Sequence, residues 1–173
     1  MSGGRFMARV KRTRQQLRGP GFRSFQSSAP TRGGHSVSIQ RNKDIVRAFY
    51  EAGDKGDVEK AMALLSDRVS WTNIGSTDFS GTFAGKADLA ESLLGPVFSR
   101  LKTGIKTTID LMVGEGEYVV VQDRGLSETT DGQPYNNTYC HIFRIEDGKI
   151  VEVTEFFDTA LAQSVLGSVA PDS

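Results

Sequence analysis

The stretch DGQPYNNTYCHIFRIEDGKIVEVTEFFD, residues 131–158, carries the strongest fold signal in the chain. It begins with Asp131-Gly132 and has a second Asp-Gly pair, Asp147-Gly148, near its middle. Asp-Gly between strand-forming residues is a strong hairpin signal, because glycine supplies the positive φ that a tight turn requires. The stretch therefore predicts β-strands near 135–145 and 149–158.

A third tight turn, Glu115-Gly116, extends this pattern toward the N-terminus. The turn glycines fall at 116, 132 and 148, a constant spacing of sixteen residues. Two more strands are therefore expected, near 105–113 and 118–128. Strands of similar length joined by tight turns form an antiparallel meander.

The residues before the meander have helical periodicity. An apolar stripe marks a helix at Asn42–Ala52, and a second helix follows it. A third helix runs from about Lys86, and Pro96 should kink or restart it. Val69–Thr72 is expected to be a short strand, and 73–84 a loop that can hold another. We therefore predict an α+β fold in which three N-terminal helices pack on a curved, mainly antiparallel sheet and enclose a pocket.

Composition indicates one soluble domain with a chemically different N-terminal arm. The chain has 173 residues, enough for one domain with a hydrophobic core, and it has no apolar run long enough to span a membrane. Residues 1–41 hold nine basic residues and no acidic one, although the net charge of the whole chain is zero. We expect a disordered arm over 1–39, a domain over 40–167 and a disordered tail over 168–173.

Three interpretations of the basic arm stay open: a disordered leader, an organelle transit peptide or a nucleic-acid-binding arm. No folded RNA- or DNA-binding motif accompanies the arm, which disfavours a nucleic-acid partner. The single cysteine, Cys140, excludes an internal disulfide and suits a reducing compartment. The expected location is the cytoplasm, or the mitochondrial matrix if residues 1–40 are a transit peptide.

The turns also predict which side chains share a face of the sheet. If every turn has a two-residue loop, directly opposed residues point to the same side. The helix-covered face then combines apolar walls with a polar cluster, as ligand pockets do: Gln122, Arg124, Asn137, Tyr139, His141 and Asp158. Asp123 and Glu155 fall on the other face, whose excess of apolar residues predicts a partly buried dimer interface.

Asp158 and His141 are the predicted catalytic residues. A carboxylate in an apolar cavity has a raised pKa and can act as a general acid or base. The alternative for Asp158 is a hydrogen bond to Asn137 or a cap on the segment that starts at Thr159. His141 titrates near neutrality and can move a proton, and its alternative is a satisfied core histidine.

Five further side chains are predicted to bind the substrate, the first four at its polar end: Arg124, Tyr139, Asn137, Gln122 and Trp71. The alternative is a buried polar network for Arg124 and Tyr139 and a core position for Trp71. With two histidines in the chain and one of them, His35, in the arm, no metal cluster is expected. No phosphate-binding loop, nucleophile elbow or HExxH motif is present, and no cofactor is predicted.

The order of elements and several local motifs resemble the nuclear transport factor 2-like superfamily, within it the SnoaL-like and ketosteroid-isomerase-related branch. The resemblance covers about residues 40–167 and is carried by six segments: Asn42–Leu65, Val69–Trp71, Phe83–Lys86, Asp131–Tyr139, Glu146–Val153 and Glu155–Thr159. It implies a cone-shaped cavity of the cystatin-like α+β barrel type, a carboxylate inside it and a homodimer through the outer sheet face.

The superfamily contains isomerases, polyketide cyclases of the aldol type, epoxide hydrolases and dehydratases, and also members that only bind or dimerise. The resemblance thus implies a cofactor-independent enzyme that uses general acid/base chemistry on a hydrophobic small molecule. The alternative is a non-catalytic ligand-binding or dimerisation module of the same fold.

Overall fold

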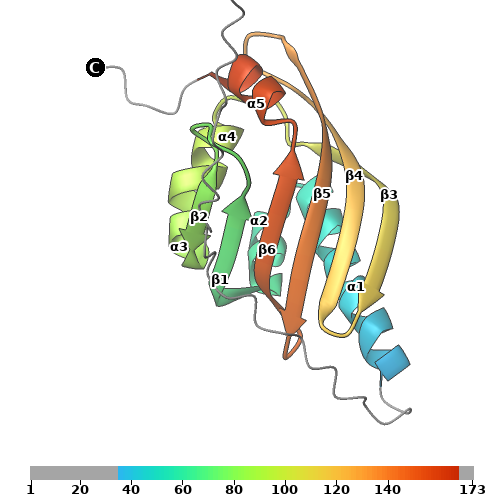
Figure 1. Ribbon diagram of the computed structural model, residues 1–173. Coiled ribbons are helices and arrows are strands. Elements are labelled where there is room, and N and C mark those ends of the chain that lie inside the picture. The colour runs from blue at the N-terminus through green and yellow to red at the C-terminus, as the bar shows by residue number, and fades with distance from the viewer. Residues whose placement is uncertain (1–34, 168–173) are drawn as a thin grey trace, which may run out of the picture. The chain divides into compact units, whose positions relative to one another are not determined.

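A computed structural model of the chain describes residues 35–167, with side chains from residue 39 onward. The predicted tail and most of the predicted arm lie outside these residues. The body is a curved, unclosed sheet in the order β2-β1-β6-β5-β4-β3 (Figure 1). Its strands are β1 (Leu65–Asn73), β2 (Gly81–Ala84), β3 (Lys106–Glu115), β4 (Tyr118–Glu128), β5 (Pro134–Glu146) and β6 (Lys149–Phe157).

The four strands of the predicted meander are confirmed, and the sheet is mainly antiparallel. The exception is β1, which pairs in parallel with β6 and brings the N-terminal half of the domain beside the last strand. The predicted short strand is confirmed and is longer than expected, and the second short strand in the following loop is β2. The sheet is therefore mixed.

Helices cover the concave face of the sheet. They are α1 (His35–Asp54), α2 (Val58–Leu64) and a continuous helical segment made of α3 (Gly85–Asp88), η1 (Leu89–Leu94) and α4 (Gly95–Phe98). The three predicted helices are thus confirmed, although α1 begins earlier than expected. A further helix that was not predicted, α5 (Thr159–Leu166), follows β6. None of the helices within residues 35–167 is long and apolar enough to cross a membrane.

The third helical segment changes its hydrogen-bond pattern just before Pro96, the residue at which the sequence predicts a kink or a restart. The Gly95 N–H donates to the Ala90 carbonyl five residues back, so η1 is a wider π-helical turn. Pro96 lies in the first turn of α4, where its missing N–H leaves no donor unpaired. The main core lies between these helices and the concave face of the sheet, and its largest buried side chains include Phe143, Leu65, Leu89 and Ile150.

The predicted register between β4 and β5 is wrong by one residue. The Thr129 N–H donates to the Gln133 carbonyl over 2.9 Å, so the loop between them holds three residues rather than two. Tyr139 consequently lies opposite Asp123 and not opposite Arg124. Because side chains alternate between the two faces, this slip turns every even-numbered residue of β4 to the convex face.

Two smaller irregularities complete the correction. The β5–β6 turn is the predicted one, with positive φ at Asp147 and Gly148, but a register shift after Arg144 places Glu155 opposite His141. The β3–β4 loop is Gly116-Glu117 rather than Glu115-Gly116. Asp123 and Glu155 therefore lie on the concave face, and the prediction that they lie on the other face is wrong.

Candidate functional site

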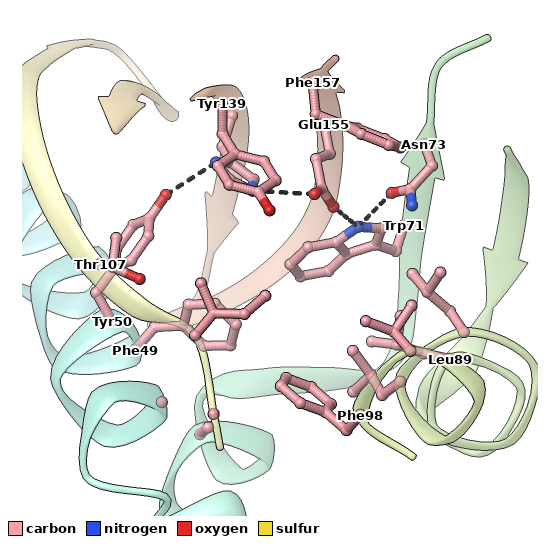
Figure 2. A pocket seen from close by; sticks show the side chains of 18 of the residues that line it. Phe49, Tyr50, Trp71, Asn73, Leu89, Phe98, Thr107, Tyr139, Glu155 and Phe157 are labelled. Atoms are coloured by element: carbon pink, nitrogen blue, oxygen red, sulfur yellow. Dashed lines mark hydrogen bonds and ion pairs between the residues drawn. The ribbon is translucent and has the colours of Figure 1, made fainter. Parts of the chain in front are cut away.

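A cavity of about 400 Å³ lies between the concave face of the sheet and the helices. Most of its wall is apolar, with Phe49, Leu89 and Trp71 among the lining residues (Figure 2). Val58 and Phe98 also line it although they are 67% and 45% exposed, which places the mouth of the cavity beside them. A hydrophobic molecule can therefore enter from solvent and lose most of its contact with water.

Three ionisable side chains from adjacent strands meet on the wall of this cavity. Asp123 comes from β4, His141 from β5 and Glu155 from β6. The His141 Nδ1 lies 2.9 Å from Asp123 Oδ1, and its Nε2 lies 3.8 Å from Glu155 Oε1. The imidazole thus lies between two carboxylates, hydrogen-bonded to one and in charge contact with the other.

The orientation of the His141 ring is fixed from several sides. It stacks between Tyr139 and Phe143, with centroids 5.6 Å away in both cases. The Tyr50 hydroxyl donates to Asp123 Oδ1 over 3.0 Å and also lies 3.0 Å from His141 Nδ1. Nδ1 is therefore held toward Asp123, which leaves Nε2 directed at Glu155.

Glu155 is held by the only tryptophan of the chain. Trp71 Nε1 donates to Glu155 Oε2 and to Asn73 Oδ1, both over 2.9 Å (Figure 2). Asn73 in turn donates to the Phe79 carbonyl, which fixes its amide. The parallel pairing of β1 with β6 makes this contact possible, because it sets Trp71 and Asn73 beside Glu155.

Burial and neighbouring charges perturb the titration of this cluster. Burial raises the pKa of Glu155, and the charge of His141 and the Trp71 hydrogen bond only partly oppose it. Burial disfavours the charged form of His141, but the hydrogen bond to Asp123 and the charges of both carboxylates outweigh it and raise the His141 pKa. Glu155 therefore holds a proton at a higher pH than an ordinary glutamate does.

Three of the predicted site residues line the cavity: His141, Tyr139 and Trp71. Asn137 is buried beside the lining residue Tyr135, and its amide contacts the hydroxyl of Tyr135 and the backbone of Asp158. The structure brings these four predicted residues to one region.

The other three predicted site residues lie elsewhere. Gln122 and Arg124 are exposed on the convex face, where Arg124 forms a bidentate ion pair with Asp110. Asp158 is exposed and caps α5 by accepting from the Leu161 N–H over 3.0 Å. Asp158 thus has the alternative role of a cap, and the predicted position inside the cavity is wrong for Asp158, Gln122 and Arg124.

Sequence-based prediction missed Asp123 and Glu155, because the register of the strands decides whether these two side chains face the cavity. The sequence also holds no separate signal for Tyr50 as a partner of Asp123. Helix periodicity alone does not distinguish a tyrosine that only packs from one that donates a hydrogen bond. Within the described part of the chain, no group of His, Cys, Asp and Glu side chains is arranged to hold a metal ion.

Comparison with known proteins agrees with this fold. Residues 46–153 match the family model of the SnoaL-like domain. No curated protein matches the chain. Among solved structures, an NTF2-like protein of unknown function from Burkholderia pseudomallei K96243 is 24% identical, with a TM-score of 0.66, over 74% of this chain and 98% of that one.

Two further solved structures share the fold. An M. tuberculosis LEH-like epoxide hydrolase is 21% identical, with a TM-score of 0.61, over 75% of this chain and 91% of that one. TerC co-crystallized with polyporic acid is 23% identical, with a TM-score of 0.65, over 74% of this chain and 99% of that one. With the family model matching well over half of its residues, the chain belongs to the SnoaL-like domain family, within the NTF2-like superfamily.

Proposed function

We propose that this protein catalyses proton transfer on a neutral, hydrophobic small molecule, with Glu155 as the general acid or base. The observation that carries the proposal is a carboxyl group on the wall of an apolar cavity, 3.8 Å from an imidazole that a second carboxylate orients. General acid/base catalysis requires a group that can both hold and release a proton near the working pH. Burial raises the pKa of Glu155 and so moves it from the ordinary glutamate range toward the pH at which a general acid or base works.

His141 and Asp123 have a supporting role in this proposal. The imidazolium, stabilised by Asp123, stabilises the Glu155 carboxylate after it has given up its proton. As a base, Glu155 removes a proton from carbon beside a carbonyl group and then returns a proton to the enolate. As an acid, it gives its proton to an oxygen, such as that of an epoxide, while water attacks carbon, and the Glu155 carboxylate then takes up the proton that this water releases. Neither reaction consumes a cofactor.

The cavity favours a neutral ligand. Its lining residues include no lysine and no arginine, and the positive charge of His141 is already opposed by Asp123 and Glu155, so within the described chain an anionic ligand would find no unpaired countercharge there. The epoxide-hydrolase relative and the relative co-crystallized with polyporic acid support a small organic molecule as the ligand class.

Deuterium exchange tests the proposal without knowledge of the natural substrate. Cyclohexanone, 2-tetralone and 2-acetylnaphthalene are incubated with the protein in D2O, exchange beside the carbonyl is followed by NMR, and hydrolysis of styrene oxide is measured in parallel. We expect the wild type to accelerate at least one reaction and Glu155→Gln to reduce that rate about 100-fold or more.

Two matched variants make this test specific. Glu152→Gln changes an exposed glutamate on the convex side of the same strand, where it pairs with Arg144, and should leave the rate unchanged. Asp158→Asn keeps a good helix cap and should do the same. No acceleration with any compound, or full activity in Glu155→Gln, would contradict the proposal, and a loss confined to Asp158→Asn would restore the sequence-based assignment.

A second proposed property is a homodimer through the convex sheet face. Five large apolar side chains on that face are between 40% and 55% exposed: Leu111, Val113, Tyr118, Leu126 and Phe156. Apolar patches of this kind mark interaction surfaces. Sedimentation of the wild type should give twice the monomer mass, and Leu126→Lys should give the monomer. A monomeric wild type would contradict this proposal and leave the catalytic one unaffected.

A further inference from the structure

Two buried tyrosine hydroxyls lie together on the cavity wall, apart from the carboxylate cluster. Tyr135 and Tyr139 are both on β5, line the cavity and are only 4% and 7% exposed. The Tyr139 hydroxyl donates to the Tyr135 oxygen over 3.4 Å. Burial raises the pKa of both phenols, so each keeps its proton at physiological pH.

Asn137 determines the direction of hydrogen bonding at Tyr135. The Asn137 Oδ1 accepts from the backbone N–H groups of Thr138 and Asp158, over 2.8 and 3.0 Å. Its Nδ2 donates to the Asp158 carbonyl and, over 3.3 Å, to the Tyr135 oxygen. Because two backbone donors fix Oδ1, the amide cannot flip, and Nδ2 must face Tyr135.

One hydroxyl proton of the Tyr135–Tyr139 pair has no acceptor among these three side chains. The Tyr135 oxygen accepts from Asn137 and from Tyr139, so its own O–H must find a third partner. Among the residues that the structure describes, no hydrogen bond from this O–H is present. If the bond between the two phenols runs in the other direction, the spare proton belongs to Tyr139 instead. In either case one O–H on the cavity wall is available to a ligand.

We propose that Tyr135 donates this hydrogen bond to a carbonyl or ether-type oxygen of the bound molecule and so selects oxygenated ligands over pure hydrocarbons. The inference deepens the proposed function and rests on the cavity being its ligand site. An accepting phenol is also a better donor, because hydrogen bonds in a chain polarise one another. Tyr139 stacks on His141, which places the phenol pair and the acid/base cluster on the same cavity.

Two nearly isosteric probes test this donor: 2-acetylnaphthalene, which has a C=O group, and 2-isopropenylnaphthalene, which has C=CH2 in its place. Their affinities are measured by calorimetry, and the carbonyl stretch of the bound ketone is measured by infrared spectroscopy. We expect the wild type to prefer the ketone about 3- to 10-fold, the range that one neutral hydrogen bond gives. The carbonyl stretch should move to lower wavenumber on binding.

Three variants separate the donor from general effects on the cavity. Tyr135→Phe should abolish both the preference and the infrared shift, and Tyr139→Phe should weaken them. Tyr118→Phe, at an exposed tyrosine on the convex face, should behave like the wild type. Thermal melting of each variant verifies that it is folded, and Phe keeps the ring that packs in each position.

The outcomes distinguish this inference from the proposed function. Glu155→Gln should lose turnover but keep the ketone preference and the infrared shift. Equal affinity of the wild type for the two probes, or an unchanged infrared shift in both Tyr135→Phe and Tyr139→Phe, would overturn the donor role and leave the acid/base proposal intact. Failure of both probes to bind would overturn the inference together with the proposed ligand class.

Discussion

Asp123→Asn should uncouple His141 from its charge partner while preserving the shape of the site. Asp123 is 2% exposed and accepts from Tyr50 and from His141 Nδ1, over 3.0 and 2.9 Å. An asparagine oxygen can accept both bonds, so the substitution removes charge rather than contact. A hydrogen bond between charged groups contributes about 1.5–3 kcal/mol to stability, against about 0.5–1.5 kcal/mol for a neutral one. We therefore expect a loss of about 1–2 kcal/mol while the imidazole is protonated.

This loss should depend on pH with a defined sign. The folded-state pKa of His141 lies above its ordinary value of 6.5, so the stability that its proton contributes is complete below about pH 6.5 and disappears as pH rises through the folded-state pKa. Urea unfolding should therefore show the largest difference between wild type and Asp123→Asn near pH 6, and a smaller one at alkaline pH.

NMR titration measures the same coupling directly. The chain has two histidines, so His35→Ala leaves His141 as the only imidazole to observe. Adding Asp123→Asn to this background should lower the pKa of His141. Asp110→Asn, which removes an exposed carboxylate bound to Arg124, is the control and should leave it unchanged. An unchanged His141 pKa in Asp123→Asn, or a stability difference that does not vary with pH, would refute the reasoning.

Substitutions at three other positions have defined outcomes. The stability of Glu155→Gln relative to wild type should rise as pH increases from 4.5, the ordinary glutamate pKa, through the raised folded-state pKa. In this pH range Glu155 is protonated in the folded wild type but releases its proton when the chain unfolds, which destabilises the wild type. Urea unfolding across the range measures the difference in stability. Gly125→Ala should cost about 1–3 kcal/mol by thermal or urea unfolding, since its Cβ would lie 2.6 Å from Ile105 Cγ2 and 2.9 Å from Tyr139 Cε2. Asp158→Ala should cost about 1 kcal/mol through loss of the α5 cap, and Asp158→Asn clearly less, with no change in deuterium exchange for either. A neutral Gly125→Ala, a flat pH profile for Glu155→Gln, or equal losses for both changes at Asp158 would contradict these assignments.

The fold was predictable because its signals are local. Asp147-Gly148 specifies its own turn, with φ of 50° and 78° at the two residues, whatever the rest of the chain does. The helices follow in the same way from apolar periodicity, and Pro96 marks the place where the third one changes its hydrogen bonds. The parallel pairing of β1 with β6 was not predicted, because it joins segments far apart in sequence that no turn connects.

The site was less predictable because side chains alternate between the two faces of the sheet, so an error of one residue in register exchanges the faces. Asp131-Gly132 fits a two-residue or a three-residue loop equally well by composition, and only the Thr129–Gln133 hydrogen bond distinguishes them. That single residue decides whether Asp123 or Arg124 faces the cavity. The β5 residues His141 and Tyr139 do lie on the predicted face, since alternation along one strand does not depend on the length of any loop.

The pairing of β1 with β6 also has a consequence for how the protein reaches its native state. The Trp71–Glu155 bond spans 84 positions of the chain, and we expect a contact of such long range to close late, after the local hairpins have formed. Before it closes, Glu155 is not yet buried, so the raised pKa of this glutamate should be a property of the fully folded domain only. Since Trp71 is the only tryptophan of the chain, its fluorescence during refolding should report when its bond to Glu155 forms and the site is complete.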